Sequence, residues 1–159
     1  MLSQIVELIL ITLLPFLELR ASIPYGILRF NMHFMVVFLI CVIVNIILGI
    51  VIYLFLEQII KIVTKIRIIE KLWNKYVERT QKKIHKAVEK YGELGVAIFI
   101  GIPLPGSGVY SGAIASYLIG LNFKKFIIAD IIGVLIAGIL VTIITLTGVE
   151  AFNFFIKII

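Results

Sequence analysis

A carboxylate and a guanidinium stand two residues apart in an otherwise apolar stretch near the N-terminus, at Glu18 and Arg20. In the hydrocarbon core of a membrane each such charge costs about 2.5–3.5 kcal/mol, so each needs a partner or a water-filled cavity. Side chains two positions apart share one side of an extended backbone but point about 200° apart on an α-helix. The two residues form either a structural ion pair or a site where Arg20 binds an anionic group while Glu18 titrates or orients it.

Prolines flank this pair at Pro15 and Pro24 and predict an irregular backbone. Each proline removes a backbone donor, and Pro24 also pushes the preceding Ile23 away from helical dihedral angles. At membrane depth, irregular backbone survives only inside protein or against a water-filled cavity. We therefore expect a broken helix in this stretch, with structural breaks at both prolines.

A second break is expected near residue 103, because two prolines and four glycines fall between residues 101 and 112. Ser107 is a plausible N-cap for a half-helix running to Ile119. The positive dipole end of that half-helix would favour an anion. A glycine-rich packing joint is the alternative interpretation. The expected breaks and binding groups are Pro103 and Pro105, and Gly106, Ser107, Gly108, Tyr110 and Ser111.

An acidic residue also interrupts the last apolar stretch, at Asp130. It is either a partner for Lys124, about 9 Å away along a helix, or a partner for Arg20 or a proton carrier. Burial raises the pKa of a carboxylic acid, so Glu18 is a second candidate for proton coupling.

The remaining reactive residue types do not form a catalytic or metal-binding pattern. The two histidines, His33 and His85, are isolated, so we expect no metal site. Ser22 and Ser107 lack a nearby base, and no cofactor motif is present. We therefore expect a protein that is not an enzyme and needs no cofactor.

Composition places the chain in a membrane. Of its 159 residues, 62% are hydrophobic, against about 45–50% apolar residues in soluble domains. The net charge of +6 is better explained by the positive-inside rule and anionic lipid than by nucleic acid, since no nucleic-acid-binding fold signature accompanies it. The single cysteine, Cys41, excludes an internal disulfide and is expected to be a small buried residue.

The apolar stretches differ in length. Residues 34–56 and 126–148 are long enough to span a bilayer, and Ala129, Gly133 and Ala137 form a close-packing face on the second. Asn45 lies near the middle of the first and predicts an interhelical hydrogen bond or a substrate contact. Residues 2–30 and 94–121 are each either a re-entrant hairpin or a kinked span. Residues 57–93 carry ten basic and five acidic side chains on an amphipathic helical pattern.

The chain repeats one pattern twice: an apolar arm, a proline-containing break, a second arm, a short joint and a long span. If both breaks are re-entrant, the second half is inverted. We expect a first repeat at 1–56, a basic cytoplasmic arm at 57–92, a second repeat at 93–149 and an interfacial segment at 150–159. The fold class is then an all-α, multi-pass protein of the cell membrane, with two re-entrant helices and two transmembrane helices.

The stretches Pro15–Pro24 and Pro103–Gly112 together resemble the small multidrug export family, a branch of the DedA/VTT superfamily. The resemblance covers nearly the whole chain. It implies an inverted-repeat core in which two re-entrant elements face each other, and in the wider superfamily it implies translocation of lipids or polyprenyl phosphate carriers. Glu18 and Arg20 match that chemistry, whereas the second break lacks the arginine found near it in DedA proteins.

These features predict a transporter of an anionic lipid or amphipathic solute. Arg20 and the second break would bind the phosphate, and Glu18 with Asp130 would couple protons. The alternatives are proton-coupled export of lipophilic cations, with Glu18 as counter-ion, and a non-transporting membrane scaffold. The expected partners are membrane lipids, and the small core makes a homodimer plausible.

Overall fold

The computed structural model describes residues 2–63, 75, 78, 92–103 and 107–157, and these residues form helices and connecting turns without a strand. The helices named within these ranges are α1 (Leu2–Leu13), α2 (Glu18–Leu28), α3 (Phe34–Val63), α5 (Glu93–Gly101), α6 (Val109–Leu118) and α7 (Phe123–Lys157). The all-helical prediction is therefore confirmed for the described part of the chain. Apart from a few residues at its two ends and at 75 and 78, the basic arm predicted at 57–92 lies outside the described residues.

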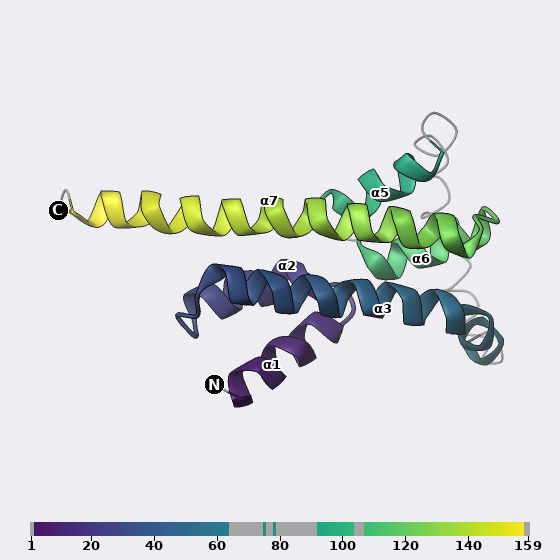
Figure 1. The fold of residues 1–159 in the computed structure, drawn as a ribbon, viewed down its shortest axis with the longest axis horizontal. Helices are drawn as coiled ribbons and strands as arrows, with labels where there is room; N and C mark the ends of the chain where they lie inside the picture. The colour runs from purple at the N-terminus through teal and green to yellow at the C-terminus, as the bar shows by residue number, and fades with distance from the viewer. Residues whose placement is uncertain (1, 64–74, 76–77, 79–91, 104–106, 158–159) are drawn as a thin grey trace.

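The two longest helices, α3 and α7, lie side by side along the long axis of the molecule (Figure 1). Within them, Phe34–Leu56 and Phe123–Gly148 are long and apolar enough to cross a membrane. Many of their large apolar side chains are exposed, for example Leu39, Ile43 and Ile144. Such exposure would be costly in water but suits a lipid surface. The two predicted spans are thus confirmed by length and composition, and α7 continues as one helix to Lys157.

The first break is a turn at residues 14–17, between α1 and α2. Phe16 and Glu18 have φ values of +71° and +48° there, which non-glycine residues seldom adopt. The break predicted at Pro24 is wrong, because Pro24 lies inside α2. The neighbouring Ile23 is fully buried, so packing against the adjacent helices outweighs the local preference of the residue that precedes a proline.

The second break separates α5 from α6. It begins at Ile102, whose backbone is extended, and ends at Gly108, whose φ is +124°. Pro103 lies at its start. Two of the predicted residues, Pro105 and Gly106, lie outside the described part of the chain. The described residues therefore confirm an interruption of the helix here.

Each half of the chain packs in the same way. In the first half α1 and α2 contact each other and α3, and in the second half α5 and α6 contact each other and α7. The halves then meet through α2 against α7, α3 against α6, and α3 against α7. The predicted close-packing face of α7 is confirmed, because Ala129, Gly133 and Ala137 are buried, and a Cβ on Gly133 would lie 2.7 Å from the carbonyl oxygen of Ala97.

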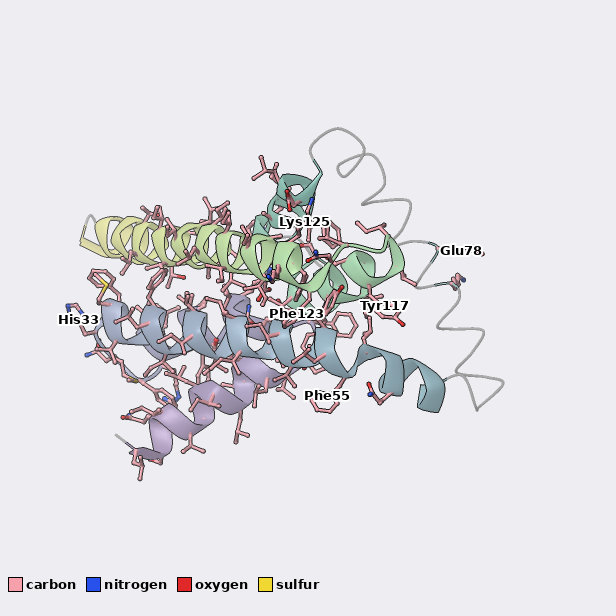
Figure 2. The ribbon with its side chains drawn as sticks, turned by 45° about the vertical axis from the view of Figure 1, so that its right-hand side comes forward. His33, Phe55, Glu78, Tyr117, Phe123 and Lys125 are labelled. Carbon is pink, nitrogen blue, oxygen red and sulfur yellow. The ribbon has the colours of Figure 1, made fainter. Side chains whose placement is uncertain are left out.

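Aromatic side chains join α3, α6 and α7 at one end of the molecule. The Tyr53 ring stacks on Phe126 at a centroid distance of 4.5 Å and lies 6.4 Å from Tyr117. Its hydroxyl donates to the carbonyl oxygen of Leu121. Figure 2 shows Tyr117 toward one end of α3 and His33 at the opposite end. These contacts fix the register of the two long helices and so position the residues between them.

Candidate functional site

Glu18 occupies the N-terminus of α6, although the two lie some ninety residues apart in the chain. Its side chain is buried, and its two carboxylate oxygens accept hydrogen bonds from the backbone amides of Val109 at 3.3 Å and Tyr110 at 3.4 Å. These amides have no partner within the helix, and the positive end of the helix dipole favours a negative charge. The N-terminus of α6 therefore holds a negative group, and in this structure that group is the carboxylate of Glu18.

Arg20 lies at a helix C-terminus, whereas Glu18 lies at a helix N-terminus. Its guanidinium donates to the carbonyl oxygens of Ile100 at 3.2 Å and Ile102 at 3.1 Å, at the C-terminus of α5, and to the backbone oxygen of Ser107. A positive charge is favourable beside these carbonyls. Both terminal nitrogens are engaged in this way, so the guanidinium fork predicted to hold a phosphate binds the second break instead.

Glu18 and Arg20 also pair directly, with 3.4 Å between Arg20 Nη1 and Glu18 Oε2. This pairing occurs at the start of a helix, where their spacing would normally separate them. The left-handed φ of Glu18 removes that residue from helical geometry. Gly108 makes room for the pair, because a Cβ on Gly108 would lie 2.3 Å from Glu18 Oε2 and 2.6 Å from Arg20 Nη1.

The hydroxyl groups of the second break serve mainly to join the two breaks. The prediction that Ser107 caps α6 is wrong: the N-cap is Gly108, without a side-chain capping bond. Ser107 Oγ instead donates to the carbonyl oxygen of Ile102 at 2.6 Å and accepts from Arg20 at 3.1 Å. The Tyr110 hydroxyl donates to the carbonyl oxygen of Leu13 at 2.6 Å.

A small cavity of about 100 Å³ lies between the breaks. Its lining residues are Pro15, Phe16, Glu18, Ser107, Tyr110, Ser111 and Ile114. Ligand pockets for organic molecules usually measure about 300–1,000 Å³. The structure therefore places Glu18, Ser107, Tyr110 and Ser111 of the predicted site around one space, which in this conformation is too small for a solute of that size.

Asp130 is fully buried in the middle of the bundle, and the predicted contact with Lys124 is absent: neither carboxylate oxygen has a hydrogen-bond partner among the described residues. Lys125, the next basic residue, pairs with Glu93 at the surface at 3.5 Å. The Asp130 carboxylate lies directly against α3, where a Cβ on Gly49 would be only 2.6 Å from Asp130 Oδ1.

Asn45 connects these acids. It lies one helical turn before Gly49 on α3 and is buried, its side chain interacts with Glu18, and its amide oxygen has no partner among the described residues. We call Glu18, Arg20, Asn45 and Asp130 the buried polar cluster. With its ionisable groups charged, two carboxylates and one guanidinium give the cluster a net charge of −1.

The sequence did not assign Gly49 to the site, and it left the role of Asn45 open. The available signal was a polar residue followed four positions later by a glycine within an apolar span, since positions i and i+4 share a helix face. The described residues contain no group of three or more histidine, cysteine or acidic side chains that could hold a metal ion. The buried polar cluster brings two carboxylates, a guanidinium and an amide together, and the described residues show no nucleophile paired with a base.

A larger groove lies between α3 and α7. It encloses about 470 Å³ and is lined by Phe34, Met35, Phe38, Leu135, Ile139, Thr142, Ile143 and Leu146. Its volume is in the range of small-molecule pockets. Aromatic rings and a methionine suit adaptable binding of apolar groups. The groove and the buried polar cluster share α3, with Phe38 and Asn45 seven residues or about 10 Å apart.

Comparison with known proteins gives a family match. No curated protein and no solved structure matches the chain significantly. Residues 18–140, which contain the buried polar cluster, the first long apolar segment and most of the second, match the family described as "Putative small multi-drug export protein". Since that match covers more than half of the chain, the protein belongs to the small multi-drug export family of membrane proteins.

Proposed function

We propose that the protein is a proton-coupled membrane exporter of lipophilic, positively charged solutes. The observation that carries this proposal is the buried Asp130 carboxylate, which lacks a partner among the described residues and lies in a cluster of net charge −1. An ionisable group in a span is costly and usually functional. The family description, which names multi-drug export, supports the export part of this proposal.

The two acids of the cluster take different roles in this proposal. Glu18 is held by two amides and by Arg20, so it fixes the two breaks against each other. Asp130 is free of such contacts among the described residues and is the acid that takes up and releases the coupling proton. A cationic solute and a proton would compete for its negative charge, which couples the two movements in opposite directions.

The apolar groove would receive the lipophilic part of the solute. It lies between the two spans, about 10 Å along α3 from Asn45, and its rim is open to the lipid-facing surface of Phe34 and Met35. A lipophilic cation enriched in the bilayer could therefore enter from the side. Its charge would then be drawn along α3 toward the buried polar cluster.

Alternating access would come from the two breaks. We propose that α1–α2 and α5–α6 are re-entrant elements of an inverted repeat, as in the DedA/VTT superfamily, and that one half rocks against the other around the cluster. The matching pairing of helices in the two halves supports this arrangement. The basic arm would lie on the cytoplasmic side.

The test is export by purified protein in liposomes. An outward-directed proton gradient, with the lumen acidic, should drive accumulation of ethidium, a lipophilic cation, in inside-out proteoliposomes. Asp130→Asn, which keeps the size of the side chain, should abolish this accumulation. Glu93→Gln removes an exposed acid that pairs with Lys125 and should leave it unchanged. Equal accumulation in wild type, Asp130→Asn and protein-free liposomes would contradict the proposal.

A second candidate function is translocation of an anionic, phosphate-bearing lipid. The observation that favours it is the Glu18 carboxylate at the α6 amides, because a phosphate could replace a carboxylate there once the breaks separate. Equilibrium binding of a short-chain phosphate lipid should then fall severely in Arg20→Ala and modestly in Arg20→Lys, which keeps the charge but loses the fork. If neither transport activity is detected, the remaining interpretation is a non-transporting membrane scaffold.

A further inference from the structure

Three buried acceptor oxygens lie on the helices α3 and α7, which pack against each other. They are Oδ1 and Oδ2 of Asp130 and Oδ1 of Asn45, and none has a hydrogen-bond partner among the described residues. Both side chains are almost fully buried, with exposures of 0% and 1%. Buried polar atoms are nearly always satisfied in proteins, so three unsatisfied acceptors in one place call for a ligand that is positively charged.

The three oxygens share neighbours, which places them together. Asp130 lies against Gly49, with both of its oxygens within 2.7 Å of the position that a Cβ would occupy. Asn45 lies one turn away on the same face of α3. The carboxylate of Glu18 interacts with the side chains of both Asn45 and Asp130. The absence of a side chain at residue 49 therefore leaves Asp130 beside Asn45 and Glu18.

We propose that Asp130 and Asn45 bind a sodium ion, in competition with the coupling proton. The inference rests on the proposed function, since it assigns a second ion to the acid that carries the proton. Carboxylate, amide and hydroxyl oxygens are the ligands of hard cations. One monovalent ion brings the cluster charge from −1 to zero, whereas a divalent ion would leave an excess positive charge in the interior.

The number of acceptors is the reason for choosing a metal ion over a proton alone. A proton bound to one Asp130 oxygen provides a single donor, so at least one of the other two acceptors stays unsatisfied. A metal ion can contact all three at once. Protonation of Asp130 removes the charge that attracts the ion, so sodium binding should weaken as the pH falls.

The charged and titratable groups around Asp130 determine whether the pH dependence of sodium binding can be assigned to Asp130 itself. Among the described residues, Glu18 of α2 is the charged group that acts on Asp130, and Glu18 is itself paired with Arg20. On α6, Tyr110 also interacts with Glu18. The helix α3 contributes the neutral Asn45 and Gly49. If the pH dependence of sodium binding comes from Asp130, it should therefore be unchanged when an exposed acid such as Glu93 is substituted.

The experiment measures thermal unfolding of the purified full-length protein in detergent, with NaCl, KCl or choline chloride at one ionic strength. At pH 8 the melting temperature should rise with the logarithm of the sodium concentration, by roughly 5 °C at one hundred times the dissociation constant. Potassium and choline should have little effect, and the sodium effect should shrink at pH 5. Glu93→Gln should behave as wild type.

Direct binding of ²²Na⁺ to the wild-type protein gives a second measurement that does not depend on the folding of any variant. Asp130→Asn should lose this binding, and Asn45→Ala should weaken it at least tenfold. Gly49→Ala keeps every ligand but places a Cβ against the Asp130 carboxylate, so it should weaken binding too.

Wild-type protein that binds no ²²Na⁺ and melts at the same temperature in all three salts would overturn the sodium site. Proton-driven ethidium export would survive that result, so the proposed function would stand. Conversely, sodium binding that depends on Asp130 in a protein without export would support the site and contradict the function. Sodium binding retained in Asp130→Asn would show that the ion binds elsewhere and would also overturn the proposal.

Discussion

The hydroxyl of Tyr110 donates a 2.6 Å hydrogen bond to the carbonyl oxygen of Leu13, the last residue of α1. A side chain from the start of α6 thus satisfies the end of α1, beside the first break. Glu18 and Arg20, in the first turn of α2, do the same for the ends of α6 and α5. The two breaks therefore stabilise each other, and each exposes few unpaired backbone groups.

Removal of the Tyr110 hydroxyl tests this relationship. Tyr110→Phe should lower the free energy of unfolding in detergent by about 1 kcal/mol, because one hydrogen bond is lost while the ring remains. Tyr117→Phe is the matched control on the same helix, since Tyr117 contributes a ring contact to Tyr53. Equal effects of the two substitutions would show that the Leu13 contact adds no stability.

The ion pair between Glu18 and Arg20 should be coupled energetically. Glu18→Gln should lower the free energy of unfolding by about 3 kcal/mol, since breaking a buried pair leaves an unpaired charge. In that background Arg20→Gln should cost clearly less than it does alone. A double-mutant cycle on unfolding in detergent measures this difference. Simple additivity would mean that the contacts of Arg20 with carbonyl oxygens matter and its contact with Glu18 does not.

Gly108 is expected to be essential for stability for two separate reasons. Its φ is +124°, and the ion pair of Glu18 and Arg20 lies close to its Cα. Gly120 has a φ of +70° and open space where its Cβ would be. Gly120→Ala should therefore show only the backbone cost, about 1–2 kcal/mol. Gly108→Ala should be more destabilising and should also separate Glu18 from Arg20. If thermal unfolding ranks the two variants equally, the close contact at Gly108 is not important.

The two ends of the bundle should face opposite sides of the membrane. His33 and Lys124 are exposed. They lie at the starts of α3 and α7, which are at opposite ends of the molecule (Figure 1), and lysines favour the cytoplasmic side. Single cysteines at these positions, in a Cys41→Ala background, should react with an impermeant thiol reagent from opposite sides, Lys124→Cys from the cytoplasm. Labelling of both positions from the same side would exclude the proposed re-entrant topology of residues 94–121.

Local sequence features predicted the elements of this fold well. Span length and hydrophobicity gave Phe34–Leu56 and nearly the whole of the second span, and Pro15 marked the first break correctly. The prediction at Pro24 was wrong, since tertiary packing keeps that residue in a helix. Composition also indicated correctly that Cys41 would be buried.

The arrangement of the site was harder to predict from the sequence than the helices were. The contacts of Glu18 and Arg20 join residues 80 to 92 positions apart, and no local pattern shows which helix end a distant side chain will reach. The left-handed φ of Glu18, which allows it to pair with Arg20, is likewise imposed by its surroundings. The sequence identified the charged residues, but their partners follow only from the packing of the two halves.

The lengths of the two long helices have a consequence for the surrounding lipid. The apolar segments of α3 and α7 contain 23 and 26 residues, or about 35 and 39 Å at 1.5 Å per residue, against about 30 Å of hydrocarbon in a typical bilayer. Because they pack side by side, they must correct this hydrophobic mismatch together, by a common tilt or by thickening the bilayer around them. Acyl-chain length should therefore influence how readily the two halves move, and the protein should favour the thicker regions of a mixed membrane.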